Sequence, residues 1–551
     1  MYLAERNTSS VRDLFSIFNS TDNSIIENFI SCIPETYSQC LADLSSLMVG
    51  PTPRGNETTY DNRTRMESSI RQFHSRGQTL STEVENALAI LRDPSSYIFV
   101  SVHQPNLFPY SGVFKKIVLA QTLKDKLRGS QQGNKIINLF VVIDHDFMDE
   151  TWIHRAQLPS AGDSGGILEL RYPVHSSERW QMVFKNPVPS PGILYQWKEQ
   201  IRTWIKKSSP KSCRSHLLKN FGDFWPYVEE SQRSAKSFAD FSSFIMSKLV
   251  NDEWKYDTLF VKLSDISHVL KEGFIFLLNN FKTYSSALRE AESVLKYNRI
   301  NNTGVSPNVY LLSPLWIHCT CGSKGSSVIQ AHSNHRARLV GKCISCKKDL
   351  SISLGNLTEL AIREEDLPNL SPRAIPILLL LSRELGSTCY ISGTGGASYA
   401  VYNAFASNRL SLRNPLFIFW PSTESYDGFA QSRALKAAGV SDRISLTEYA
   451  YKLGQLQNDY PKKISPLLKK RKESLGSEEQ FQIILRQLFK LKQKQREVRQ
   501  SMKVATKAVK ALNLRPCIID YIVNFGSNGI EARWRNSLER NDSLAGETPW
   551  K

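Results

Sequence analysis

Short runs of apolar and β-branched residues alternate with helical stretches through the middle of this chain. Tyr97 to Val102 and Leu139 to Ile143 are two such runs, and a helical stretch from about Gly112 to Leu127 separates them. Runs this short and apolar predict strands that are buried on both faces. Four more candidate strands follow, at 259–263, 309–312, 388–391 and 416–420. The strand–helix–strand order predicts an α/β protein with a parallel sheet.

The two ends of the chain have a helical pattern instead. Apolar residues recur at helical spacing from Val11 onward, and again over 481–512 with a 3-4 spacing sustained for more than four heptads. The second pattern predicts a coiled coil. We expect it to begin with a capping box at Ser477 and to end before Pro516.

These patterns divide the chain into five parts. They are a helical N-terminal region (1–95), the first part of the core with a helical insertion (96–300), a cysteine-containing insertion (301–355), the second part of the core with a glycine-rich loop (356–455), and a basic coiled coil with a tail (456–551). The apolar runs are all shorter than the ~18 residues that a membrane span needs. The N-terminus has no apolar signal segment, so we expect a protein without membrane attachment.

The cysteines and the net charge indicate the cellular location and the kind of partner. The chain has 551 residues and nine cysteines, an odd and mostly dispersed set that predicts reduced thiols and a cytoplasmic location. Its net charge of +18 favours anionic partners, which include nucleic acid, phosphate-bearing cofactors and anionic metabolites. The alternative is that much of this charge lies on one exposed C-terminal helix.

Polar residues follow the first predicted core strand directly. His103, Gln104 and Asn106 lie at its carboxyl end, where open α/β sheets bind their ligands. These side chains can donate and accept hydrogen bonds to a nucleotide or substrate. The helix that follows offers its N-terminal amides to a phosphate, and Lys115 and Lys116 in its first turns add positive charge.

A second polar group follows the next predicted strand. Asp144, His145 and Asp146 place two carboxylates beside an imidazole, which is costly to bury without purpose. His145 is a candidate general base or substrate-orienting group. Either aspartate could hold a substrate amine or a magnesium ion. The structural alternative is a polar loop in which aspartate caps a helix and histidine packs on the sheet.

A glycine-rich loop follows the strand predicted at 388–391. Gly393, Thr394, Gly395 and Gly396 precede a predicted helix that contains Tyr399. A strand, a glycine turn and a helix N-terminus can together bind a phosphate or a carboxylate. The loop fits neither the Walker motif nor the dinucleotide fingerprint. A tight turn with no ligand is the alternative.

Four cysteines are clustered in the predicted insertion. Cys319 and Cys321 are separated by one residue, and Cys343 and Cys346 by two. Zinc prefers four thiolates in a tetrahedron, so this pattern predicts a zinc knuckle. Four protein ligands leave no open position, and we therefore expect a structural zinc. A reduced cysteine cluster without metal is the alternative.

The predicted coiled coil has an unusual charge balance. Between Phe481 and Leu512 there are nine Lys or Arg residues and one acid, Glu497. Coiled coils usually mix both signs at their flanking positions, so this helix suggests an anionic partner such as RNA. The alternative is a solvated helix that pairs within the protein or with a second subunit to form a homodimer.

Three short motifs carry a family resemblance. The order FVSVHQPNLFPYSGVFKKI, then LFVVIDHDFMDE, then CYISGTGGASY resembles the bacillithiol-biosynthesis cysteine-adding enzyme family (BshC-like). That family has a Gln-containing loop after its first core strand, an Asp-His-Asp-Phe block after the next, and a late glycine-rich loop. It is similar as well in its helical N-terminal region and its C-terminal coiled coil. The loop departs from the usual Gly-Gln-Gln, and its His-Gln-Pro-Asn string is similar to the WbqC-like proteins.

The resemblance implies a fold and an activity. The fold would be a Rossmann-like, nucleotidylyltransferase-like core, and the activity a carbon–nitrogen ligase that joins cysteine to glucosaminyl malate through an amide. By this resemblance Gln104, Asn106 and the Asp144–Asp146 block would line the pocket, and the glycines would bind a phosphate or carboxylate. ATP or another nucleotide with magnesium would be the cofactor, and an amino acid and an amino sugar the substrates. An RNA- or tRNA-associated protein that uses the zinc knuckle and the basic coiled coil is the alternative function.

Overall fold

The computed structural model describes residues 33–34, 36–49, 57–129, 133–297, 305, 308–332, 335–393, 396–420 and 428–541. The helix predicted from Val11 lies outside the described residues. Among the helices that are described, none combines the length and the apolar character needed to cross a bilayer.

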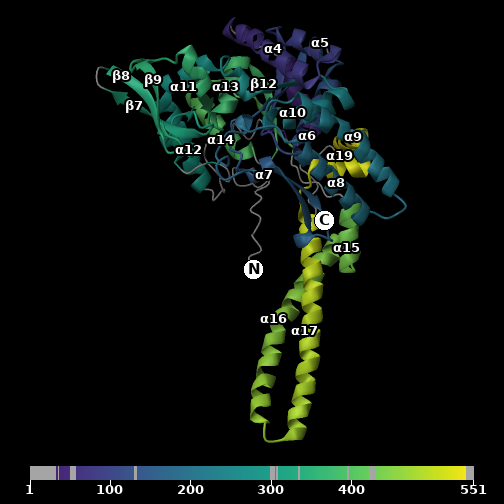
Figure 1. The fold of residues 1–551 in the computed structure, drawn as a ribbon. Helices are drawn as coiled ribbons and strands as arrows, with labels where there is room; N and C mark the ends of the chain where they lie inside the picture. Colours follow the sequence, from purple (N-terminus) through teal and green to yellow (C-terminus); the bar gives the residue numbers. More distant parts are fainter. Residues whose placement is uncertain are drawn as a thin grey trace.

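A parallel five-stranded sheet forms the centre of the molecule, as the strand–helix alternation predicts (Figure 1). Its strands are β1 (Tyr97–His103), β2 (Ile136–Val142), β5 (Leu259–Lys262), β12 (Ser387–Ser392) and β13 (Leu416–Phe419). Their spatial order is β13-β12-β1-β2-β5, and each neighbouring pair is parallel. The chain therefore runs outward from β1 to β5 and then crosses back to β12, which is the strand order of a doubly wound sheet.

Alternating side chains of the central strands bury both faces of this sheet. On β2, Ile136, Phe140 and Val142 pack into one hydrophobic core, while Ile137 and Leu139 pack into the other. Successive side chains on a strand point to opposite faces, so a strand with buried apolar side chains on both faces must be covered on both sides. Helices therefore cover both faces of the sheet.

These helices come from most of the chain. They are α3 (Tyr37–Val49), α4 (Glu57–Gly77), α5 (Thr82–Leu91), α6 (Ser111–Leu127), α7 (Thr151–His154), α8 (Pro191–Ser208), α9 (Arg214–Ser234), α10 (Phe238–Ser247), α11 (Lys271–Asn279), α12 (Phe281–Tyr297), α13 (Pro376–Leu385), α14 (Ala397–Arg409) and α15 (Phe429–Ala438). A short antiparallel pair, β3 (Arg155–Pro159) and β4 (Ile167–Arg171), lies outside the main sheet. Helix α6 packs in the first core, which contains Ile136 of β2. Helices α12, α13 and α14 contribute to the second core, which contains Ile137.

A second sheet, with six antiparallel strands, lies within the insertion. Its strands are β6 (Leu315–His318), β7 (Lys324–His332), β8 (Arg336–Lys342), β9 (Asp349–Asn356), β10 (Glu359–Leu360) and β11 (Leu370–Pro372), in the order β10-β9-β8-β7-β6-β11. The predicted boundary at residue 355 is too early, because β11 pairs with β6. The strand predicted at 309–312 is wrong. Asn308 takes the left-handed conformation and begins a single helical turn at Val309–Leu311.

The predicted C-terminal helix pairs within its own chain. Helix α16 (Arg443–Glu473) and helix α17 (Glu478–Asn513) form a hairpin that projects from the body (Figure 1). The apolar spacing explains this pairing, since Ala505 and Leu512 of α17 share a cluster with Leu446 and Leu453 of α16. The hydrogen bond of the predicted capping box is not formed, although Ser477 does precede the helix.

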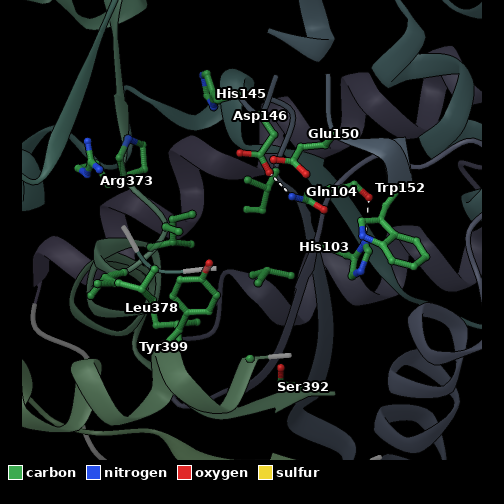
Figure 2. Close-up of a pocket in the computed structure, with 18 of the residues that line it drawn as sticks. His103, Gln104, His145, Asp146, Glu150, Trp152, Arg373, Leu378, Ser392 and Tyr399 are labelled. Atoms are coloured by element: carbon green, nitrogen blue, oxygen red, sulfur yellow. Dashed lines mark hydrogen bonds between the residues drawn. The ribbon is translucent and has the colours of Figure 1, made fainter. Parts of the chain in front are cut away.

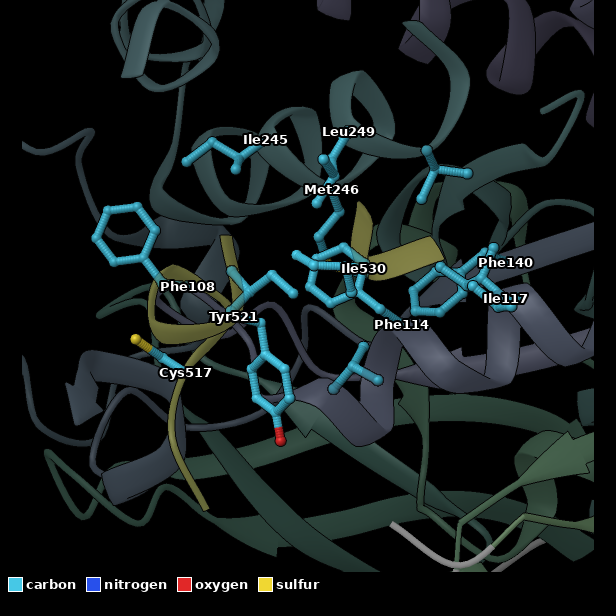
Figure 3. Packing of buried hydrophobic residues seen from close by; sticks show 14 of the residues in the cluster. Phe108, Phe114, Ile117, Phe140, Ile245, Met246, Leu249, Cys517, Tyr521 and Ile530 are labelled. Carbon is cyan, nitrogen blue, oxygen red and sulfur yellow. The ribbon is translucent and has the colours of Figure 1, made fainter. Parts of the chain in front are cut away.

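The last predicted part, 456–551, begins too late, because helix α16 already starts at Arg443. The residues after α17 form α18 (Ile518–Phe525) and α19 (Ser527–Asn541), and residues 542–551 lie outside the described residues. Tyr521 and Ile530 pack beside Phe114 of α6 in the first core (Figure 3). The C-terminal segment thus belongs to the body because its apolar face completes that core.

Candidate functional site

The strand order directs attention to one edge of the parallel sheet. Strands β1 and β12 are neighbours, but the chain leaves them in opposite directions. At such a switch point the loops after the two strands part and leave a crevice, where doubly wound proteins bind ligands. A pocket with a volume of about 560 Å³ lies here (Figure 2). Residues after β1, β2 and β12 line it, so the structure brings together the three predicted loops.

The loop after β1 contributes His103 and Gln104. The imidazole Nδ1 of His103 lies 3.0 Å from the carbonyl oxygen of Gln104, which fits an N–H donor there and leaves Nε2 as the acceptor, 3.5 Å from the Tyr110 hydroxyl. Burial and the nearby Lys116 lower the pKa of His103 to about 3. The His103 ring is therefore neutral at pH 7. The Gln104 amide donates to the carboxylate of Asp146 across the pocket edge.

The loop after β2 divides its three polar residues. Asp146 and His145 line the pocket, whereas Asp144 does not. The Asp144 carboxylate is fully buried and accepts hydrogen bonds from the backbone N–H (3.0 Å) and hydroxyl (2.5 Å) of Ser264. Burial raises the pKa of Asp144 to about 6. Its predicted role in holding a substrate amine or a magnesium ion is not supported, because its carboxylate faces Ser264, just after β5.

The imidazole of His145 lies at the junction of the pocket and the insertion. Its Nδ1 is 3.6 Å from the nearer Asp144 oxygen, and among the described residues this nitrogen has no hydrogen-bond partner. Its ring centroid is 5.1 Å from that of His318. Burial, with the charges around it, lowers the pKa of His145 well below its ordinary value. A neutral imidazole in this place can accept or donate a hydrogen bond, but its lowered pKa does not favour the predicted role of general base.

The glycine-rich loop after β12 reaches the same pocket. Gly393, Gly396 and Tyr399 all line it, while Thr394 and Gly395 lie outside the described residues. A side chain at Gly396 would place its Cβ 2.1 Å from the hydroxyl oxygen of Ser392, so that hydroxyl would have to move. Burial raises the pKa of Tyr399 to about 12, which keeps its phenol protonated.

Two predicted pocket residues lie elsewhere. The Asn106 side chain donates to the carbonyl of Trp152 at 2.7 Å and lines a small neighbouring cavity. The ammonium of Lys115 lies 5.5 Å from the ring centroid of Trp420 on the core side of α6. In a helix, adjacent residues point about 100° apart, so only one of two consecutive lysines can face the sheet edge. That lysine is Lys116, which lines the pocket and donates to the Val102 carbonyl at 3.1 Å.

The insertion supplies pocket residues that the sequence pattern does not reveal. The ammonium of Lys324 donates to the His145 carbonyl and lies 4.7 Å from the ring centroid of Trp316. The guanidinium of Arg373 stacks on the same ring at 4.2 Å and donates to the Ser326 hydroxyl at 3.1 Å. Burial lowers the pKa of Lys324 to about 8, and burial lowers that of Arg373. Both cations are held in place by an aromatic ring and by hydrogen bonds.

The pocket thus has two electrostatically different sides. Asp146 and Glu150 stand beside Gln104 on one side, and Arg373 lies across the pocket from them (Figure 2). Partial burial and the neighbouring Asp146 raise the pKa of Glu150. Such an arrangement can bind a molecule, or a pair of molecules, that carries both an ammonium and an anionic group.

The four predicted cysteines converge beside this pocket. Their sulfur atoms all lie within 4.8 Å of one another, with Cys319 and Cys346 3.6 Å apart and Cys321 and Cys343 3.5 Å apart. Four thiolates around tetrahedral zinc are separated by about 3.8 Å. The cluster could therefore hold a metal such as zinc. Within the described part of the chain, no other group of three or more metal-ligating side chains lies this close.

The cluster is connected to the pocket through the chain itself. Cys321 is three residues before Lys324, and the Ile344 amide in the second cysteine loop donates to the Lys324 carbonyl at 3.1 Å. The Gly322 carbonyl accepts a hydrogen bond from the Met182 amide in the body at 2.9 Å. A bound metal would thus fix the strand start that presents Lys324.

Comparison with known proteins gives no match. No protein-family model matches the sequence, and no curated protein matches it. The resemblance to the bacillithiol cysteine-adding enzymes stays a prediction, and it depends on the three loops that meet in the pocket.

Proposed function

We propose that this protein is a ligase that forms an amide between an amine and a carboxyl group of small metabolites. The observation that carries the proposal is the two-sided pocket at the carboxyl edge of the sheet, with Asp146 and Glu150 on one side and Arg373 across from them (Figure 2). The resemblance to the enzymes that add cysteine to glucosaminyl malate supports the same chemistry. An amino acid and an amino sugar with a carboxylate would match the two sides.

Amide formation needs an uncharged amine held against a carboxyl carbon. Asp146 and Glu150 would bind the substrate as its ammonium, and Arg373 and Lys324 would bind the anionic group. Burial lowers the pKa of Lys116 to about 7, so this side chain can accept a proton near neutral pH. Holding the two reacting groups together removes much of the entropic barrier to their reaction.

In this proposal a nucleotide would bind at the glycine-rich side of the pocket. Gly393 and Gly396 lie where α14 begins, and the backbone amides of a helix N-terminus favour a phosphate. ATP would supply the activation that a carboxylate needs before an amine can displace its oxygen. Asp146 and Glu150 are also the carboxylates that would meet the accompanying magnesium. The four cysteines would hold a structural zinc.

Calorimetric titration of the whole chain tests this proposal. Cysteine, glucosaminyl malate and magnesium ATP are titrated into the wild type, into Arg373→Gln and into the matched control Arg338→Gln, whose side chain is exposed. We expect Arg373→Gln to weaken binding of the malate-bearing ligand by about tenfold or more, because a charged hydrogen-bond donor is lost. The control should bind as the wild type does. A folded wild-type protein that binds none of the three ligands would refute the proposal.

A further inference from the structure

The hairpin of α16 and α17 carries most of the net charge of the molecule. Residues 443–513 contain 17 Lys or Arg residues and six Asp or Glu residues, a net charge of +11 out of the +18 of the whole chain. The hairpin projects from the body, away from the pocket-bearing sheet (Figure 1). The pocket does not explain this concentration of charge.

Six of these cations form one line along α17. We name this set the basic stripe, and its members are Lys492, Arg496, Arg499, Lys503, Lys507 and Lys510. At 100° per residue the six positions fall within about 80° of the helix circumference, and they extend over about 27 Å. Five of the six side chains are exposed and Lys507 is half-buried.

The basic stripe has no internal neutralisation. Among the described residues, none of its six side chains forms an ion pair, and the ion pair that the hairpin does show joins Lys462 to Asp459 in α16. The acid Glu497 points to a different side of α17, about 80° beyond the nearer edge of the stripe. Aligned like charges repel one another, so such a line costs stability unless an anion binds it.

From this geometry we infer that the basic stripe binds RNA, independently of the chemistry in the pocket. Regularly spaced cations match a phosphate backbone. An anionic membrane would need a wide apolar face beside the basic one, but the apolar seam of α17 is already packed against α16. Two paired helices are about 20 Å across, too wide for the ~12 Å major groove of B-DNA, whereas the minor groove of RNA is wide and shallow.

An exposed aromatic ring on the same helix supports contact with unpaired bases. Phe489 is 71% exposed and stands one turn before Lys492 and next to Lys490. A phenylalanine has no packing reason to stand in water on a helix whose apolar seam is elsewhere. Aromatic rings beside cations are where single-stranded bases stack.

Fluorescence anisotropy with a labelled RNA stem-loop tests the inference on the full-length protein. The stripe variant is K492Q/R496Q/R499Q/K503Q, and glutamine keeps the helix because its helix propensity is similar to that of lysine. The control variant, K206Q/K207Q/K211Q/K236Q, removes the same charge from exposed sites on other elements. A charge-keeping variant, K492R/R496K/R499K/K503R, separates loss of charge from damage to the helix.

We expect the stripe variant to bind RNA at least tenfold more weakly, and its plot of log affinity against log salt to be shallower by about 3. The control and charge-keeping variants should stay within twofold of the wild type, and Phe489→Ala should weaken stem-loop binding by about tenfold. Equal losses in the stripe and control variants would overturn the inference, as would equal affinity for a matched DNA duplex. Capture by phosphatidylserine vesicles or by a second copy of the chain, without RNA binding, would overturn it as well.

Discussion

The pocket and the hairpin both gather positive charge, but in opposite settings. In the pocket, Lys116 and Arg373 are only 5% and 7% exposed, and burial lowers the pKa of each. On the hairpin, the basic stripe stands almost entirely in water. A buried cation is costly unless hydrogen bonds hold it, so each one in the pocket has defined partners. An exposed cation lowers the stability of the fold very little, and salt screens its interactions with other charges.

This difference separates two kinds of recognition. Fixed and partly dehydrated charges select a ligand by its shape and by the position of its groups. Exposed, solvated charges attract any polyanion, and the binding free energy is the sum of many weak contacts. Single substitutions of charged residues should therefore have large effects around the pocket and small effects on the hairpin.

The largest effect is expected at the cysteine cluster. Cys343→Ser removes one of the four thiolates, and we expect bound zinc to fall from about one atom per chain to less than a tenth, since structural sites need all four ligands. The second sheet should then become sensitive to protease, because the metal contributes to its folding. Atomic absorption and limited proteolysis measure these changes. The control Cys213→Ser removes a cysteine distant in sequence, on a different element, and should leave the metal content unchanged.

A smaller but still clear effect is expected at Asp146. Asp146→Asn removes the charge that would pair with an ammonium and should weaken binding of the amine ligand by about 10- to 100-fold. The control Asp349→Asn alters a carboxylate whose side chain is 92% exposed and should have no effect. Calorimetry measures both, and an unchanged affinity in Asp146→Asn would mean that the acidic side does not bind the amine.

A substitution at Lys116 is expected to stabilise the protein instead of weakening a function. The unfolded chain keeps this proton up to a pKa near 10.5, whereas the folded protein loses it above about 7, so the unfolded state binds more protons between these values. Stability contributed at this site therefore rises with pH across that window. Lys116→Met should flatten this rise and increase the free energy of unfolding at pH 7 by about 1–2 kcal/mol.

Urea denaturation at pH 7 and pH 10 measures this prediction. The control Lys126→Met lies on the same helix with a side chain that is 52% exposed, so its substitution should change the pH dependence little. A Met variant of Lys116 that is less stable than the wild type at pH 7 would show that the lysine is structural.

The smallest effect is expected on the hairpin. Lys462→Gln breaks the exposed ion pair with Asp459, which has a distance of 3.8 Å. Exposed pairs of this kind contribute about 0–1 kcal/mol, so the thermal midpoint should barely move. A large drop in the thermal midpoint, measured by circular dichroism, would show that charges on the hairpin matter as much for stability as those in the pocket.

Most of the candidate site could be placed from the sequence, because strand ends can be recognised locally. The apolar runs before His103, Asp144 and Ser392 identify three parallel strands, and parallel strands end at the same edge of a sheet. The convergence of these loops in one pocket follows from that rule. The spacing of the four cysteines is a local signal in the same way.

Other features could not be predicted, because they depend on contacts between distant segments. Lys324 and Arg373 reach the pocket only because the second sheet folds back against the strand ends. The choice between Lys115 and Lys116 is set by how α6 rests on the sheet. The contact between Asp144 and Ser264 joins residues 120 positions apart in the chain.

The sequence by itself therefore determined the five strands of the parallel sheet, the polar loops that follow three of them, the cysteine cluster and the charged C-terminal helix, since each depends on neighbouring residues and on backbone periodicity. The tertiary structure decided which polar side chains face the cavity, which cations oppose the acids, and that α17 pairs with α16. Side-chain direction and partner choice depend on how elements pack, and packing energy is shared among residues far apart in the chain.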